Sequence, residues 1–212
     1  MKNTQIIFGI TLSAVVALGL ALSAPTAMAS QSTSDRGSGS ASVVGLPATV
    51  FSASKLPKWR SMYARHRSQA GNKQWINAVG QIKKVPSARL LSETNRIVNR
   101  ARGRADSGDS WSTPSELFSK GGDCEDYAIA KYLLLRQAGY SASNMHILVL
   151  KAKSGQQAHA VLVVGSGSNA VVLDNQRSGV YSMNSALRSR VFIAFNERNL
   201  WLPNRKVQAA GN

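Results

Sequence analysis

Apolar residues in the first half of the chain recur every three or four positions, which is the spacing of one face of an α-helix. The residues that carry this spacing are Trp59, Met62, Tyr63, Trp75, Ile76, Val79, Leu90, Leu91, Ile97 and Val98. We therefore expect residues 55–105 to form a lobe of helices. Gly103 and Gly108 then interrupt the pattern and predict a loop ahead of the next apolar run.

Two helices are expected to follow this loop in close succession. Residues 113–116 combine a threonine cap, a proline in the first turn and a capping-box glutamate, so a short helix begins there and ends at the glycine pair 121–122. The second helix runs from Cys124 to about Ala138, is apolar on most of its faces and stops at Gly139. This pattern puts Cys124 at the first turn of a buried helix.

The hydrophobic period changes from helical to alternating after this second helix. Four short segments rich in β-branched residues predict strands, at residues 145–152, 159–165, 169–176 and 190–196. We interpret them as an antiparallel sheet behind the central helix. The fold class is therefore α+β, with one domain and no internal repeat.

The N-terminal segment has the pattern of a secretory signal. A lysine precedes an apolar run over residues 6–22, and a small-residue cleavage site follows at residues 27–29. Cleavage after Ala29 is expected; the alternative is that the apolar run, roughly 17 residues long, stays as a membrane anchor. Serine and glycine dominate the next segment, which predicts a flexible leader. The expected division is a signal peptide at 1–29, a leader at 30–43, one domain at 44–203 and a tail at 204–212.

The chain is strongly basic, with 26 lysines and arginines against 10 acidic residues and a net charge of +16 at pH 7. Signal removal takes away one lysine and no acid, which leaves +15. Such a charge favours acidic partners, either an anionic envelope surface or an acidic exported protein. The basic residues are scattered and form no nucleic-acid motif, so no nucleic-acid partner is expected; the alternative is an ordinary solvated surface.

The chain has a single cysteine, Cys124, which excludes an intramolecular disulfide. A lone thiol in an exported protein is inertly buried, paired with another chain, or reactive. A helix start offers unpaired N–H groups and a partial positive charge, which lower the pKa of a thiol and can bind an oxyanion. A nucleophilic Cys124 would also need a base, and the usual one is a histidine oriented by a third polar group.

Three acids surround the cysteine: Asp123, Glu125 and Asp126. Carboxylate oxygens are ligands of hard cations, and a bound Ca²⁺ would offset the repulsion that these carboxylates exert on a thiolate. Asp106 and Asp109 in the preceding loop could complete the shell. The alternative is that the acids only complement the helix dipole. Zinc is not expected, because one cysteine and three scattered histidines lack its ligand spacing.

Among the three histidines, His159 is the candidate base. His66 lies in a basic helical stretch and is expected on the surface, and His146 begins a strand and could face either side. If residues 165–168 form a symmetric hairpin loop, His159 lies directly opposite Asp174, close enough for the carboxylate to hold one imidazole nitrogen. The pattern predicts a Cys-His-Asp triad that a register slip of one residue would break.

A resemblance to a known family rests on three strings: GGDCEDYAIAKY at 121–132, AHAVLVV at 158–164 and VVLDNQ at 171–176. They resemble the bacterial transglutaminase-like cysteine proteinases, the LapG-like periplasmic proteases, and the similarity extends over about residues 57–203. The resemblance implies a papain/transglutaminase-like fold. It also implies that Cys124 is the nucleophile, His159 the general base and Asp174 its orienting partner.

The same resemblance implies a Ca²⁺ site that uses Asp123 and Glu125, with Asp126 as a third candidate. Proteases of this kind act in the periplasm and clip the N-terminal region of a large surface adhesin, which releases cells from a biofilm. An inner-membrane receptor of the LapD type, which senses cyclic di-GMP, holds them inactive. We expect an exported, Ca²⁺-dependent cysteine endopeptidase with no stable membrane insertion after signal cleavage. The alternatives are transglutaminase-type acyl transfer to an amine and a catalytically silent binding module.

Overall fold

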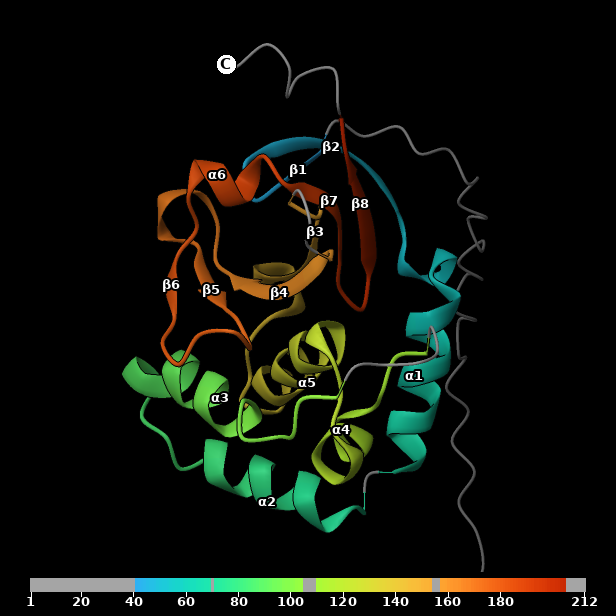
Figure 1. Cartoon of the computed structure of the whole chain (residues 1–212), viewed down its shortest axis with the longest axis vertical. Helices are drawn as coiled ribbons and strands as arrows, with labels where there is room; N and C mark the ends of the chain where they lie inside the picture. The colour runs from blue at the N-terminus through green and yellow to red at the C-terminus, as the bar shows by residue number, and fades with distance from the viewer. Residues whose placement is uncertain (1–40, 70, 105–109, 154–156, 205–212) are drawn as a thin grey trace, which may run out of the picture. The chain divides into compact units, whose positions relative to one another are not determined.

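Within the part of residues 41–104 that the structure describes, three α-helices lie ahead of the cysteine region, as the spacing of apolar residues predicts. In the computed structural model they are α1 (Pro57–Ser68), α2 (Lys73–Ile82) and α3 (Leu90–Val98). The Asn72 side chain caps α2 by accepting hydrogen bonds from the N–H groups of the second and third helical residues, at 3.0 and 3.2 Å. Both α2 and α3 contact the central helix α5 (Figure 1).

The structure describes residues 41–69, 71–104, 110–153 and 157–204, which lie in one compact unit. The expected signal peptide, most of the expected leader and the tail beyond residue 204 fall outside these ranges, as do Asp106 and Asp109. Within the described ranges, no helix combines the length and the apolar character needed to cross a membrane.

The next two helices, α4 (Pro114–Lys120) and α5 (Cys124–Gln137), begin and end where their caps predict. The Thr113 hydroxyl accepts from the N–H of Glu116 at 3.1 Å, and the Glu116 carboxylate accepts from the N–H of Thr113 at 2.8 Å. This reciprocal pair is the predicted capping box. Gly139 follows α5 at a φ of +91°, a left-handed conformation that glycine adopts without strain.

Eight antiparallel strands form one curled sheet in the order β1-β2-β8-β7-β3-β4-β5-β6 (Figure 1). They are β1 (Ala41–Val43), β2 (Leu46–Ser52), β3 (Met145–Leu150), β4 (His159–Val164), β5 (Val171–Leu173), β6 (Tyr181–Ser182), β7 (Val191–Phe195) and β8 (Asn199–Pro203). The predicted strands are β3, β4, β5 and β7, each shorter than expected. The other four were missed because β2 and β8 contain prolines, and β1 and β6 are only two or three residues long.

The expected boundary between leader and domain, after Val43, lies too far along the chain. Ala41 pairs with Ala48 and Val43 pairs with Leu46 in the ladder between β1 and β2. The Val43 side chain has no exposed surface, so it belongs to the core. The leader assignment is therefore wrong for residues 41–43. Although the residues before them are polar, these three residues pair with β2, and Val43 is buried against apolar residues of other strands.

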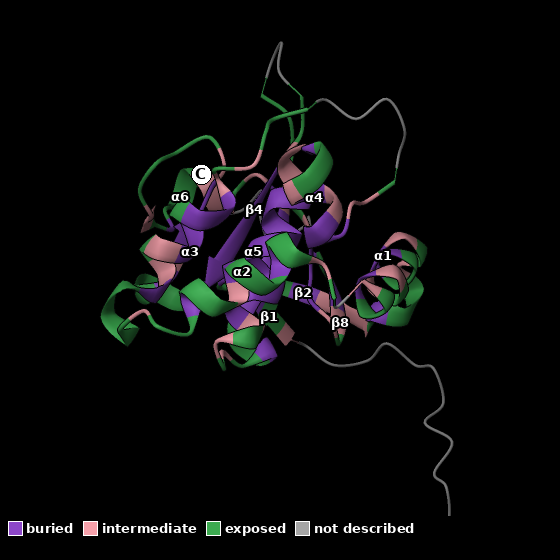
Figure 2. Ribbon diagram, turned by 90° about the horizontal axis from the view of Figure 1, so that it is seen from below, coloured by how far each residue is buried: buried purple, intermediate pink, exposed green. Residues whose placement is uncertain are grey.

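Two apolar cores cover the opposite faces of the sheet. On one face α5 packs against β3 and β4, and its residues Ile129 and Tyr132 have no exposed surface. On the other face the strands form a second core, to which Leu148, Val161 and Val172 belong. Figure 2 shows α5 and β4 largely buried, with much of the outer surface of α1 and α2 exposed. The predicted central helix on an antiparallel sheet is thus confirmed.

His66 is buried, contrary to the expectation that it lies on the surface. Its side chain lies edge-on to Trp75, with ring centroids 5.1 Å apart. Burial lowers the pKa of His66. The basic residues around it in the sequence carry no information about this aromatic neighbour on the next helix.

His146 lies on the face of the sheet that carries the second core. Its ring is 4.9 Å from that of Trp201, between centroids, and only 8% of the residue is exposed. Burial lowers the pKa of His146 to about 4.

We expect the free energy of unfolding to fall between about pH 7 and about pH 5, partly because of His146. Its pKa is lower in the folded state than the ordinary 6.5, so the stability is present above 6.5 and is lost as pH falls toward the folded value. This residue should account for about 1 to 2 kcal/mol of the loss. Urea unfolding at both pH values should show a shallower pH dependence for His146→Leu. Equal pH dependence in the native protein and this variant would contradict the prediction.

Candidate active site

Cys124 lies at the first turn of α5, as predicted, and two neighbouring acids cap that turn. Asp123 and Asp126 form a capping box, in which each carboxylate accepts from the backbone N–H of the other. The Asp126 carboxylate also accepts from the N–H of Ser112 at 2.6 Å. These bonds hold the start of the helix, and with it the cysteine, in a fixed position.

The glycine pair ahead of the cysteine permits a close approach of backbone and side chain. A β-carbon on Gly122 would lie 2.3 Å from Oδ2 of Asp126, and one on Gly121 would lie 2.5 Å from the carbonyl oxygen of Arg102. The N–H of Gly122 donates to that same carbonyl at 3.2 Å, and its own carbonyl accepts from the N–H of Arg104 at 2.9 Å. The chain around Arg104 is thus fastened beside the start of α5.

His159 and Asp174 make a short, direct contact. Nε2 of His159 lies 2.8 Å from Oδ1 of Asp174. The carboxylate also accepts from the backbone N–H of Gln176 at 2.9 Å and from the Tyr181 hydroxyl at 3.0 Å. Because the carboxylate holds Nε2, Nδ1 is the nitrogen left for proton exchange, and it lies 3.5 Å from the Gln176 side-chain amide.

These donors keep the buried carboxylate of Asp174 ionised. Burial by itself would raise its pKa, but the hydrogen bonds from His159, from the backbone of Gln176 and from Tyr181 hold the pKa below its ordinary value. An ionised Asp174 can stabilise a protonated imidazole. Burial and the Asp174 charge raise the pKa of Tyr181, so its hydroxyl remains a donor.

The strand register behind this contact differs by two residues from the predicted one. Leu162 lies opposite Leu173, so the ladder would not place Asp174 directly opposite His159. The loop is longer than predicted, because Gly167–Asn169 form a 3-10 turn within it. A shift of two keeps both residues on the same face, since side chains alternate with a period of two. The contact survives as a diagonal one.

The thiol of Cys124 is protonated in these surroundings. Its sulfur donates to Oε2 of Glu125 over 3.2 Å. Burial and the carboxylates of Glu125 and Asp123 raise the pKa of Cys124 to about 12, although the backbone N–H of Ala160 bonds to the sulfur and opposes this rise. The net direction is therefore opposite to the one that a helix start alone favours. The bond from Ala160 nevertheless brings the residue after His159 next to the sulfur.

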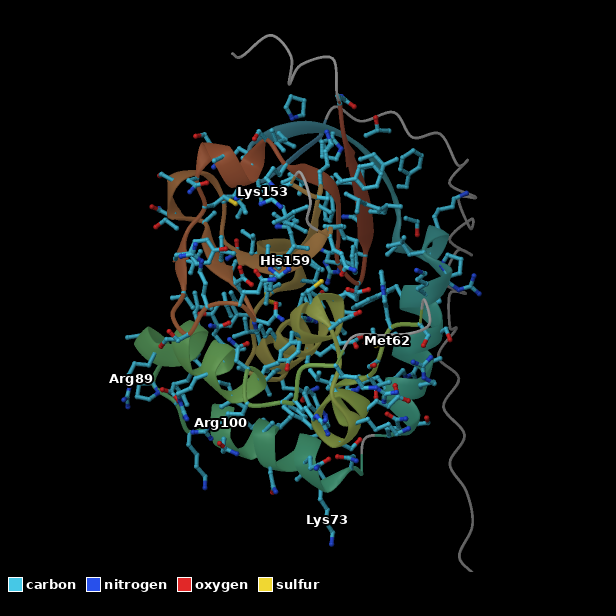
Figure 3. The ribbon with its side chains drawn as sticks, in the orientation of Figure 1. Met62, Lys73, Arg89, Arg100, Lys153 and His159 are labelled. Atoms are coloured by element: carbon cyan, nitrogen blue, oxygen red, sulfur yellow. The ribbon has the colours of Figure 1, made fainter. Side chains whose placement is uncertain are left out.

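The three predicted catalytic residues line a common cavity. Its volume is about 820 Å³, and Cys124, His159 and Asp174 all contribute to its wall. Other parts of the wall come from the start of α5, from the end of β3, from the turn after β5 and from α6 (Ser185–Arg188). Figure 3 shows His159 between the sheet and α5. The cavity therefore has a thiol, an imidazole and an ionised carboxylate, which are the catalytic groups of a cysteine hydrolase.

The three acids around Cys124 do not converge on one point. Asp126 is 2% exposed, and both of its oxygens accept backbone N–H groups, so it caps the helix in this structure. A carboxylate oxygen that accepts one hydrogen bond still has a lone pair for a cation, so the assignment of Asp126 as a Ca²⁺ ligand stays a prediction. Asp123 and Glu125 are half-buried at the helix start. Among the described residues, no three acidic, histidine or cysteine side chains are grouped as a metal site. Because Ca²⁺ takes six to eight oxygens, these residues do not form its shell by themselves.

Sequence reasoning missed two residues near the site. Tyr181, which holds Asp174, lies in a two-residue strand with no pattern of its own. Lys131 is 1% exposed within α5, and its ammonium lies 5.9 Å from the centre of the Tyr127 ring. Burial lowers the pKa of Lys131 to about 7, and the Asp174 charge opposes that shift. The signal for Lys131 was that it is the only charged residue in the apolar stretch of α5 between Asp126 and Arg136.

Comparison with known proteins adds independent evidence. The sequence profile of the bacterial transglutaminase-like cysteine proteinases matches residues 62–195. No curated protein matches the chain. Among solved structures, Legionella pneumophila LapG is similar with a TM-score of 0.52 and 28% identity, over 65% of this chain and 80% of LapG. EGTA-treated LapG matches with the same TM-score over 62% and 75%, and calcium-bound LapG, at 27% identity, over 68% and 86%.

Proposed function

Because the chain belongs to the bacterial transglutaminase-like cysteine proteinases and is a cysteine peptidase, we propose that it is an exported endopeptidase with a Cys124-His159-Asp174 triad. The observation that supports the triad most strongly is the 2.8 Å contact between His159 and Asp174 in the cavity that Cys124 also lines. A carboxylate at Nε2 keeps a proton on that nitrogen and leaves Nδ1 as the base. Because the family consists of cysteine proteinases, we do not propose the alternative of a catalytically silent binding module.

The proposed cycle begins when the Cys124 thiol gives its proton to Nδ1 of His159. The sulfur bonds to the carbonyl carbon of the substrate, and N–H groups of the first turn of α5 stabilise the resulting oxyanion. The protonated His159 then gives its proton to the leaving amine as the C–N bond breaks, which leaves a thioester on Cys124. Water, deprotonated by His159, attacks the thioester; the C–S bond breaks, the carboxylic acid leaves and the thiol is restored.

The proposed substrate is the N-terminal region of a large surface adhesin, cut at a small-residue site. Two observations support a protein substrate: the similarity to LapG at 28% identity, and a cavity large enough for several residues of an extended peptide. The proposed location is the periplasm, because the first 29 residues have the pattern of a cleaved signal. An inner-membrane receptor of the LapD type is the proposed regulator.

Calcium is a proposed effector, with Asp123 and Glu125 as candidate ligands and Asp126 as a third. The similar solved structures include calcium-bound and EGTA-treated LapG. When bound, the ion would supply positive charge beside the cysteine. These carboxylates do not complete a Ca²⁺ shell, so the remaining oxygens would come from elsewhere, and Asp106 and Asp109 in the loop before the cysteine are the proposed source. None of the chemical steps above depends on the ion.

We expect the mature protein, from Ser30 onward, to cut N-terminal fragments of a large exported adhesin encoded in the same genome. Cleavage should proceed in calcium, slow after EGTA treatment, and be absent in Cys124→Ala. Sequencing the product ends locates the cut. Calcium should also raise the melting temperature of the native protein, and should do so less for Glu125→Gln, because an ion that binds only the folded state stabilises it.

Each outcome of this experiment separates one part of the proposal. Cleavage by Cys124→Ala would contradict the triad. Cleavage and melting temperature that EGTA leaves unchanged would remove calcium from the proposal. A protein that cuts other peptides through Cys124 but none of the adhesin fragments would overturn the substrate alone.

A further inference from the structure

The mechanism leaves unused a set of basic residues in the wall of the cavity. Among the described residues that line it, four are basic: Arg104, Lys153, Arg177 and Arg190. Only two are acidic, and both already have roles: Asp123 caps α5 and Asp174 binds His159. The wall of the cavity therefore carries an excess of positive charge.

The basic residues are positioned by separate elements, so their charges surround the cavity from several sides. The backbone of Arg104 is bonded to that of Gly122 beside the start of α5. The Arg190 guanidinium donates to the carbonyl of Lys151 at 2.8 and 3.1 Å, and that of Arg177 lies 4.7 Å from the centre of the Tyr181 ring.

The fourth cation, Lys153, follows β3. Figure 3 shows it on the same side of α5 as His159.

These four cations have no carboxylate partner among the described residues. The Arg–carboxylate ion pairs found there join Arg65 to Glu116, Arg96 to Glu93 and Arg136 to Glu197, and all lie outside the cavity wall. The carboxylates of a bound peptide could therefore pair with these cations without breaking an existing ion pair. Arginine in particular binds carboxylates through two parallel hydrogen bonds.

We propose that the cavity selects peptides with acidic residues next to the bond that is cut. This inference rests on the proposed endopeptidase activity and names its substrate class. Carboxylates on either side of the scissile bond meet the four cations, whereas a basic flank is repelled by them. The net charge, +16 for the whole chain and +15 after signal removal, acts in the same direction at longer range, because it draws an acidic chain toward the protein.

Peptides that differ only in flanking charge test this selection. Three fluorogenic peptides share a small-residue core and carry two acidic, two neutral or two basic residues on each side. At low salt, kcat/KM for the acidic peptide should exceed that for the neutral peptide by about threefold to tenfold, and the basic peptide should be the poorest substrate. About 0.5 M salt should reduce the difference, since it screens charges beyond a few ångströms. Equal kcat/KM values for the acidic and neutral peptides would overturn the proposal.

A matched pair of charge variants separates the cavity from the rest of the basic surface. Arg104→Gln with Lys153→Gln removes two cations from the cavity and should lower the acidic-to-neutral ratio toward one. Lys73→Gln with Arg89→Gln removes the same charge from positions that Figure 3 shows far from His159, and should keep the ratio. An equal fall in both double variants would overturn the proposal, because the net charge of the protein would then set the preference.

Binding to the inactive Cys124→Ala protein tests the charge preference without turnover. Fluorescence anisotropy should give a dissociation constant about threefold to tenfold lower for the acidic peptide than for the neutral one. If this holds but the native protein cuts none of the peptides, the acidic selection stands and the endopeptidase proposal falls. If the native protein cuts acidic and neutral peptides equally well, the endopeptidase stands and the acidic selection falls.

Discussion

Replacing Cys124 by alanine is expected to lower kcat/KM for peptide cleavage by at least about 10³-fold. The chain has no other cysteine, so no second thiol can form the thioester. His159→Ala should cause a similar loss, because the other histidines do not line the cavity: His66 lies against Trp75, and His146 lies on the second-core face. Initial rates on a fluorogenic peptide, measured with freshly purified variants, give both values.

Two controls separate lost chemistry from lost folding. Cys124→Ser changes one atom and should keep the melting temperature while activity still falls, since a hydroxyl is a far weaker nucleophile than a thiol. His66→Asn removes a histidine outside the cavity and should retain activity at temperatures well below its own unfolding transition. A loss of less than about tenfold in Cys124→Ala or His159→Ala would contradict the triad.

Asp174→Asn is expected to lower kcat by about 10²-fold to 10⁴-fold while leaving the fold intact. An asparagine amide can donate to Nε2 of His159, which would move the ring proton to Nδ1. The nitrogen that should accept the thiol proton would then already carry one. The Gln176 N–H and the Tyr181 hydroxyl donate to both carboxylate oxygens, and a single amide oxygen can accept only part of these hydrogen bonds, so the ring is also held less firmly.

The control variant for Asp174→Asn is Glu197→Gln. It also removes one negative charge, but Glu197 lies beside the C-terminal end of α5, whereas Cys124 is at the N-terminal end. Glu197 pairs with Arg136 at 3.1 Å in the last turn of that helix, about 20 Å from Cys124 along the helix axis. Glu197→Gln should leave kcat within about twofold of the native value, because this partly buried pair lies far from the reacting atoms. The pH dependence of kcat/KM should change for Asp174→Asn alone. A similar fall of kcat in both variants would show that Asp174 has no special role.

Several helices and strands were predictable because the residues that define them are close together in the sequence. Each helix boundary near the site depends on residues within four positions of it: the capping box of Thr113 and Glu116, the cap of α5 at Asp123, and the glycine that follows α5. Strands β3, β4, β5 and β7 were predictable because their alternation is internal to each strand. Strands β2 and β8 were not, since Ala48 and Pro203 pair across more than 150 residues and neither strand has a clear pattern of its own.

The candidate triad was predictable for a similar reason, although one step of the prediction was wrong. The predicted register was off by two, yet His159 and Asp174 still meet, because a shift of two keeps both on one face of the sheet. An error of one residue would have separated them. The roles of Tyr181 and of the cavity's basic residues had no comparable signal, because they come from segments far apart in the sequence.

The sequence by itself determined the helical lobe, the position of Cys124 at a helix start and the pairing of His159 with Asp174 on one sheet face, because these depend on caps and on periods of 3.6 and 2. Only the tertiary structure decided that Asp126 is a buried cap, that His66 is buried and that four cations line the cavity of the thiol. It also decided the sign of the pKa shift at Cys124. Burial and the distance between charges depend on which distant segments meet, and a local pattern does not contain that information.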